Sequence, residues 1–176
     1  MTVTESIQAP RAFEPGASAP REQFIQAMRM VASSVAVVTT DGPDGLHGAT
    51  VSAFCSVSAD PPTVLICLNG SSRIARHVAA SAGFCLNILP QEMSHVADRF
   101  AGRHDGEISD RFDNIDHSVP PGHCPALAGA LSLQCKTDSL HRSGSHWAVF
   151  GCVENITGAI QRPLTYLDGA YRPWLV

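Results

Sequence analysis

Short runs of β-branched and apolar residues, each ending at a cluster of turn-forming residues, most constrain the fold of this chain. The run at residues 35–40 ends at Asp41-Gly42-Pro43-Asp44-Gly45, and the run at 63–68 follows Asp60-Pro61-Pro62. Such runs between Gly, Pro and Asp clusters are typical of β-strands. Tight turns join strands that are neighbours in a sheet, so the pattern predicts antiparallel hairpins.

Strands outnumber helices along the whole chain. Helical spacing of Phe24, Ala27, Met28 and Val31 predicts one helix. That helix is expected at 20–32, and the remaining pattern predicts two more helices, at 71–80 and 91–101. It also predicts strands at 35–40, 47–54, 63–68, 84–89, 126–139, 146–157 and 164–166, and a long loop at 102–125. We therefore expect a mostly β protein, a closed or nearly closed antiparallel β-barrel with flanking helices over its openings. The strand-helix-strand stretch at 63–89 leaves a doubly wound α/β sheet as the alternative.

Length and charge favour a single domain with a partner subunit. The 176 residues suit one domain, which we place at 21–176 after a disordered lead-in at 1–20 that lacks a signal-peptide core. Charged residues make up only 16% of the chain, against about 25% in typical domains, so we expect another subunit to cover part of the surface. The net charge of −4 gives no footprint for nucleic acid. No apolar run reaches the roughly 20 residues of a membrane span.

The cysteines and histidines predict neither a disulfide framework nor a metal site. None of the six cysteines forms a C-x-x-C pair, and they are expected to be free thiols in a reducing cytoplasm. The eight histidines show no H-x-x-x-H or H-E-x-x-H spacing. Glycine patterns of Rossmann and P-loop nucleotide sites are also missing from the sequence.

Three stretches combine residue types that suit ligand binding. Residues 48–56 alternate small side chains with hydroxyls, which lets a flat ligand lie close to the backbone; an ordinary barrel strand facing water is the alternative. Residues 67–73 end a strand and begin a helix with two serines and Arg73, a combination that attracts phosphate, although a capped helix with a solvated arginine explains it too. His146 follows a glycine turn and can orient a hydride donor, or be satisfied by the backbone.

In their order and spacing, these stretches resemble the short-chain flavin reductases of two-component flavin-dependent monooxygenases. The likeness extends from about Arg21 to Tyr171. It is carried by residues 24–30, Val35-Ala36-Val37-Val38-Thr39-Thr40, Gly48-Ala49-Thr50-Val51-Ser52-Ala53-Phe54, Ser56-Val57-Ser58, Asp60-Pro61-Pro62, Phe84-Cys85-Leu86-Asn87-Ile88-Leu89, Phe100, Arg111-Phe112, Gly144-Ser145-His146, Pro163-Leu164 and Gly169-Ala170-Tyr171.

The resemblance implies a fold and a reaction. The fold would be the flavin-binding split barrel, a β-barrel of Greek-key topology, in a cytoplasmic homodimer with flavin near the subunit interface. The reaction would be hydride transfer from NADH, or from NADPH, to FAD or FMN, and the reduced flavin would pass to a partner monooxygenase. No basic pair for a 2′-phosphate is evident, which favours NADH. Two alternatives stay open: a non-catalytic flavin or heme carrier on the same barrel, and an oxidase that retains its flavin.

The resemblance also implies roles for individual residues. The flavin ring and ribityl chain would be lined by Thr50, Val51, Ser52 and Ala53. The ribityl-phosphate end would be held by Cys67, Leu68, Asn69, Ser71, Ser72 and Arg73. Phe100 and Arg103 would reach the outer part of the flavin. His146 would be catalytic and lie near the nicotinamide, with Ser145 where the family usually has Asp, and Tyr171 would close over the nicotinamide side.

Overall fold

The computed structural model describes residues 18–159 and 161–172 and shows a mostly β fold built on one seven-stranded sheet. The predicted lead-in lies almost entirely outside the described residues. The elements are α1 (Arg21–Arg29), β1 (Ser33–Ser34), β2 (Ala36–Gly42), β3 (Gly45–Val51), β4 (Phe54–Ala59), β5 (Pro62–Asn69), α2 (Arg73–Ala80), β6 (Gly83–Ile88), a 3-10 turn (Gln91–Met93), α3 (Ser94–Phe100), β7 (His117–Ser118), β8 (Ala126–Leu127), β9 (Leu131–Ser143), β10 (His146–Thr157), β11 (Thr165–Leu167) and β12 (Ala170–Arg172).

Every strand pair in the seven-stranded sheet is antiparallel, in the order β3-β2-β6-β9-β10-β5-β4. A doubly wound parallel sheet is therefore excluded.

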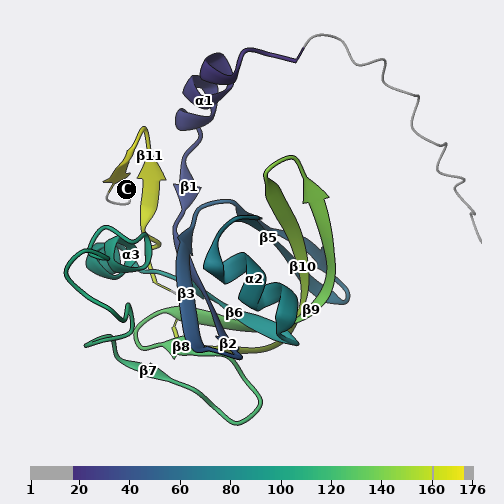
Figure 1. The fold of residues 1–176 in the computed structure, drawn as a ribbon, viewed down its shortest axis with the longest axis vertical. Coiled ribbons are helices and arrows are strands. Elements are labelled where there is room, and N and C mark those ends of the chain that lie inside the picture. The colour runs from purple at the N-terminus through teal and green to yellow at the C-terminus, as the bar shows by residue number, and fades with distance from the viewer. Residues whose placement is uncertain (1–17, 160, 173–176) are drawn as a thin grey trace, which may run out of the picture.

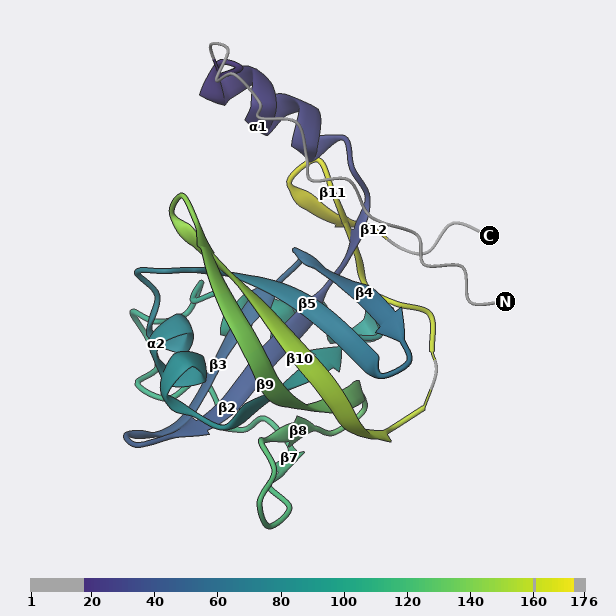
Figure 2. The ribbon, with the colours of Figure 1, turned by 90° about the vertical axis from the view of Figure 1, so that its right-hand side faces the viewer.

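The sheet curls into a nearly closed barrel whose opening is covered by α2 (Figures 1 and 2). Strand β3, at one end of the strand order, approaches β5 near the other end, and α2 packs against β2, β3 and β5. Only Ser52 and Ala53 separate β3 from β4. The chain thus passes directly from one edge of the sheet to the other at this point.

Strand β2 is buried on both faces from Ala36 to Thr40, which explains why its sequence begins with a run of apolar and β-branched residues. Ala36 and Val38 face the inner core, the cluster inside the barrel that also contains Phe84 and Ile66. Side chains alternate along a strand, so Val37 faces the opposite way, into the outer core. The outer core lies under α3 and consists of Val35, Val37, Leu89, Val96, Ala97, Phe100, Phe112, Leu127, Ala130 and Leu164.

Several predicted elements differ from those observed. The strand predicted at 47–54 ends at Val51, and a separate strand, β4, begins at Phe54. The first helix is shorter than predicted and ends at Arg29. The predicted long loop contains β7, which pairs with β8. Among the described residues, no helix is long and apolar enough to cross a bilayer.

Candidate functional site

The end of β3 carries the first predicted segment, and its residues face different ways. Thr50 donates a hydrogen bond from Oγ1 to the carbonyl oxygen of Ala97 in α3, at 2.7 Å. The Val51 side chain belongs to the inner core, so only its backbone is available to a ligand. Ser52 and Ala53 are both exposed. The exposed side chains of this segment are therefore the small ones of Ser52 and Ala53.

The second predicted segment lies directly beside the first. The backbone N–H of Cys67 donates to the carbonyl oxygen of Ala53 at 2.9 Å. Leu68 is only 2% exposed, so it too can offer a ligand only its backbone. Burial raises the pKa of the Cys67 thiol, and the neighbouring Cys55 raises it further. The Cys67 thiol is thus uncharged at neutral pH.

A local hydrogen-bond network shapes the start of α2. Oδ1 of Asn69 accepts from the backbone N–H of Ser71 at 3.0 Å and from its hydroxyl at 2.8 Å. Ser72 is the N-cap, and its Oγ accepts from the backbone N–H of Ala75 at 3.3 Å. Arg73 is exposed and opens the helix. Hydroxyls, a helix start and a guanidinium group together suit an anion.

A cavity of about 770 Å³ opens between this helix start and β3. The loop after α3 forms its third side. Its lining residues are Asp44, Gly45, Leu46, His47, Gly48, Ala49, Ser72, Arg73, Ile74, Asp105, Ile108, Ser109, Asp110, Arg111 and Phe112. The cavity is therefore continuous with the predicted phosphate-binding residues.

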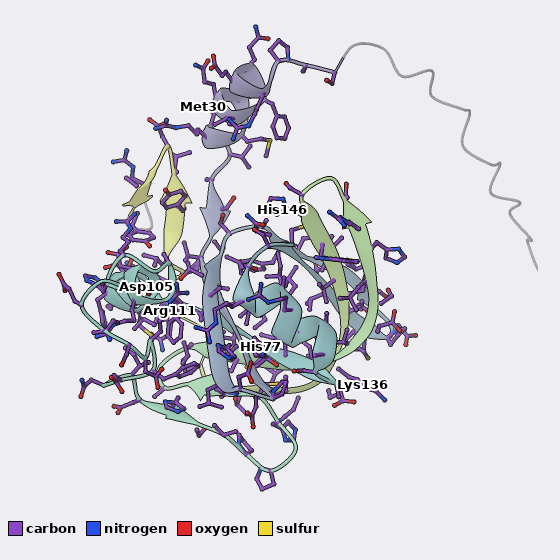
Figure 3. All side chains as sticks on the ribbon, viewed as in Figure 1. Met30, His77, Asp105, Arg111, Lys136 and His146 are labelled. Atoms are coloured by element: carbon purple, nitrogen blue, oxygen red, sulfur yellow. The ribbon has the colours of Figure 1, made fainter. Side chains whose placement is uncertain are left out.

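His146 lies beside the same segment, at the start of β10. It pairs with Asn69 across β10 and β5, and the backbone N–H of Gly70 donates to the carbonyl oxygen of Ser145 at 2.9 Å. Oγ of Ser145 lies 2.9 Å from Nδ1 of His146. His146 is exposed near one end of the barrel (Figure 3). An imidazole held in this way can present its other nitrogen to a ligand.

Phe100 does not face the cavity. It is 0% exposed in the outer core, and a Cβ on Gly48 would stand 2.5 Å from its ring. Phe100 therefore does not offer its ring to a ligand, contrary to expectation. It packs beside Gly48 and supports β3 from the side of the outer core.

Arg103 and Tyr171 contact one another. Cζ of Arg103 lies 5.8 Å from the centre of the Tyr171 ring, and its Nη1 lies 3.2 Å from Oδ1 of Asp98. Burial, followed by the interaction with Asp98, raises the pKa of Tyr171 to about 12. The pair joins the end of α3 to β12, and Tyr171 stays a neutral phenol at physiological pH.

Two features of the cavity wall were not anticipated as site features. The rings of His47 and His77 stack with centres 3.7 Å apart, and burial, His77 and Arg73 lower the pKa of His47. Arg111 forms an ion pair with Asp105 in the loop after α3. For the second feature, the sequence offered the Arg111-Phe112 motif and the long loop at 102–125 that contains Asp105 and Arg111, but not the ion pair between them. No group of three or more His, Cys, Asp or Glu side chains in the described ranges could hold a metal ion.

Comparisons with known proteins place this geometry in a family. A model of the flavin reductase like domain matches residues 28–175. An FMN reductase (NADH), RutF, of Methylorubrum extorquens is 36% identical over 174 residues, covering 98% of this chain and 82% of that protein.

Two solved structures share the fold. An NADH:FAD oxidoreductase of Streptomyces globisporus in complex with NAD and FAD fragments superposes with a TM-score of 0.80 at 27% identity, covering 88% of this chain and 93% of that one. A nitrilotriacetate monooxygenase component B from Mycobacterium thermoresistibile gives 0.79 at 28% identity, covering 88% and 86%. The chain belongs to the family of proteins with a flavin reductase like domain.

Proposed function

We propose that this protein is an NADH-dependent flavin reductase that transfers a hydride to FMN or FAD. Its relatives include an FMN reductase (NADH) and an NADH:FAD oxidoreductase. The observation that carries the proposal is the backbone hydrogen bond between Cys67 and Ala53, 2.9 Å long, which brings the two predicted flavin-binding segments together. The start of α2 and the cavity lie at the end of one of these segments.

The residues around this junction fit a flavin. Gly48, Ala49, Ser52 and Ala53 carry no bulky side chains, so a flat ring can approach the backbone. Gly48 cannot be enlarged, because Phe100 occupies the space behind it. When bound, the flavin supplies the ring that accepts the hydride.

The protein's own residues bind and orient. Arg73 would bind the phosphate through a charge-assisted hydrogen bond. Ser72, whose hydroxyl donates to the carbonyl oxygen of Asn69, would hold the start of α2 against the phosphate as its N-cap. His146 would orient the nicotinamide, with Ser145 holding its Nδ1 side. Ser52 and Ala53 are exposed, and this open edge suits release of reduced flavin to a separate monooxygenase. One solved relative is a monooxygenase component B.

The proposed assembly is a cytoplasmic homodimer of a single domain at 21–176. Helix α1 has no buried residue, and even its apolar side chains are exposed, Phe24 by 60% and Met28 by 49%. A groove of about 480 Å³ joins this apolar face to Ser52 and Tyr166. A second copy covering α1 would therefore lie next to the proposed flavin-binding edge.

A steady-state assay tests the reaction. NADH oxidation is followed with FMN, FAD and riboflavin added separately, and NADPH replaces NADH in a parallel series. Turnover that depends on added flavin supports the proposal. Pigment binding without NADH oxidation would indicate a carrier instead. A protein that purifies with bound flavin and consumes an organic substrate without a partner would indicate an oxidase.

Arg73→Ala tests the phosphate end of the site. We expect the Kd for FMN to rise about tenfold, because a charge-assisted contact is lost. Riboflavin has no phosphate, so its Kd should stay the same. Arg76→Ala removes an exposed arginine from the same helix and serves as the matched control. An unchanged FMN Kd in Arg73→Ala would remove this residue from the site.

A further inference from the structure

Arg111 connects three segments that surround the cavity. Its Nε lies 2.9 Å from Oδ1 of Asp105 and its Nη2 lies 2.6 Å from Oδ2, a two-point ion pair. Its Nη1 donates to the carbonyl oxygen of Phe100 at 2.9 Å and to that of Gly48 at 3.2 Å. One guanidinium group thus holds the loop after α3, the end of α3 and the middle of β3.

This arrangement needs the planar fork of an arginine. A guanidinium group offers five N–H donors in fixed directions, which match a carboxylate at two points and leave donors for carbonyls. Phe100 is the last residue of α3, and carbonyls at a helix end have no partner within the helix. Arg111 therefore also satisfies the end of α3.

The local backbone leaves little room around the ion pair. Gly102 has a φ of +82°, and a Cβ there would lie 2.6 Å from Nη2 of Arg111 and 2.8 Å from Oδ2 of Asp105. Beyond the ion pair, Oδ1 of Asp110 accepts from the backbone N–H of Phe112 at 2.9 Å. The loop at 102–112 is thus ordered by its own contacts as well as by Arg111.

The same loop forms one wall of the cavity. Asp105 and residues 108–112 line it together with Ser72 and Arg73 at the start of α2. Asp105 and Arg111 lie next to each other beside β3 (Figure 3). The hydrogen bond from Arg111 keeps the pKa of Asp105 below its usual range, so the pair stays ionised at neutral pH.

We propose that Arg111, paired with Asp105, is a positioning residue that fixes the loop wall against β3 and so sets the affinity of the cavity for flavin. This inference rests on the proposed function. Arg111 acts through the wall and β3 rather than on the ligand, because its Nε, Nη1 and Nη2 all have partners within the protein.

Two variants separate positioning from direct phosphate binding. Arg111→Gln removes the fork, and Asp105→Asn removes the ion pair but keeps the arginine. Positioning predicts that both variants raise the Kd for FMN and for riboflavin about tenfold, with kcat at saturating flavin within about twofold of the wild type. A direct contact with phosphate predicts that Arg111→Gln weakens FMN alone and that Asp105→Asn weakens neither, which would overturn the proposal.

Hydrogen exchange gives a readout that does not depend on flavin. Without flavin, amides at 102–112 should exchange about tenfold faster in both variants, because the wall opens locally. Arg162→Gln removes an exposed arginine away from the cavity lining and should change neither exchange nor Kd. Unchanged exchange in the two variants would overturn the positioning role of Arg111 even if flavin affinity fell.

The outcomes also distinguish this inference from the proposed function. A wild-type protein that fails to bind flavin contradicts the proposed function, whatever the exchange data show. A wild-type protein that binds flavin, with variants of unchanged Kd, contradicts only the role of Arg111. If Arg111→Gln does not fold, Asp105→Asn alone decides, since Asp105 has a side chain 51% exposed and can be replaced without leaving a cavity.

Discussion

Ser145 places a hydroxyl 2.9 Å from Nδ1 of His146, where the family resemblance leads us to expect a carboxylate. A hydroxyl can hold the ring in one orientation, but its hydrogen bond is weaker than one to a charged group. The proposed role of His146 is to orient the nicotinamide, so the hydroxyl should affect NADH more than flavin.

Ser145→Ala should therefore raise the KM for NADH about threefold, the effect of losing one neutral hydrogen bond. The KM for FMN should not change. Ser143→Ala, an exposed serine on the same hairpin, is the matched control. Steady-state kinetics with each substrate varied in turn measure both constants. An equal rise in both KM values would mean that Ser145 supports the site as a whole.

Asn87 joins four strands at the outer side of the barrel. Its side chain is 0% exposed on β6. Nδ2 donates to the carbonyl oxygen of Val37 at 3.1 Å and to Oγ1 of Thr39 at 3.0 Å, both in β2. Oδ1 accepts from the backbone N–H of Leu127 in β8 at 2.9 Å and from the hydroxyl of Ser132 in β9 at 2.7 Å. The amide fixes β8 and its loop to the barrel.

Asn87→Ala should lower the free energy of unfolding by about 2–4 kcal/mol, because buried polar groups on several strands lose their partner. Urea denaturation followed by circular dichroism measures the change. Asn155→Ala, an exposed asparagine on β10, should change it by less than about 0.5 kcal/mol. Similar values for the two variants would contradict a structural role for the Asn87 network.

At the scale of elements, the sequence predicted those strands whose burial is reflected in a local run of apolar and β-branched residues. β2 was predicted because both of its faces are buried, by the inner and the outer core, and its sequence begins with a run of apolar and β-branched residues. β4 was missed because only Ser52 and Ala53 separate it from β3, and neither is a strong turn former. The change of strand there depends on pairing with β5, which no local pattern reveals.

The residues of the candidate site also differ in whether the local sequence could predict them. Ser72 as N-cap and Arg73 at the helix start could be predicted, because a cap depends on neighbouring residues. The contact of Arg111 with Gly48 spans 63 positions, and the burial of Phe100 follows from packing under β3. Such long-range contacts exist only once the barrel has formed, so local residue patterns cannot supply them.

At the scale of the whole molecule, α1 is the element that the protomer does not explain. It projects from the barrel in both views (Figures 1 and 2). A helix of nine residues is marginal on its own in water. Its end is fixed by the ion pair between Arg29 and Asp168, 2.9 Å long and exposed. Its apolar side chains Phe24, Ile25 and Met28 remain exposed, as does Val31 just after the helix. Another copy of the chain is the partner that we propose for this face.

The double variant Phe24→Glu with Met28→Glu should convert a wild-type dimer into a monomer, as measured by size-exclusion chromatography with light scattering. Each protomer should still fold, because no α1 residue is buried in the protomer, but the thermal midpoint should fall because association of the subunits no longer stabilises the folded state. Val119→Glu changes an apolar side chain that is 41% exposed on the loop before β8 and should leave the dimer intact. Because the α1 groove also contains Ser52, the monomer should bind FMN more weakly. A wild-type monomer, or a double variant that stays dimeric, would contradict an interface at α1.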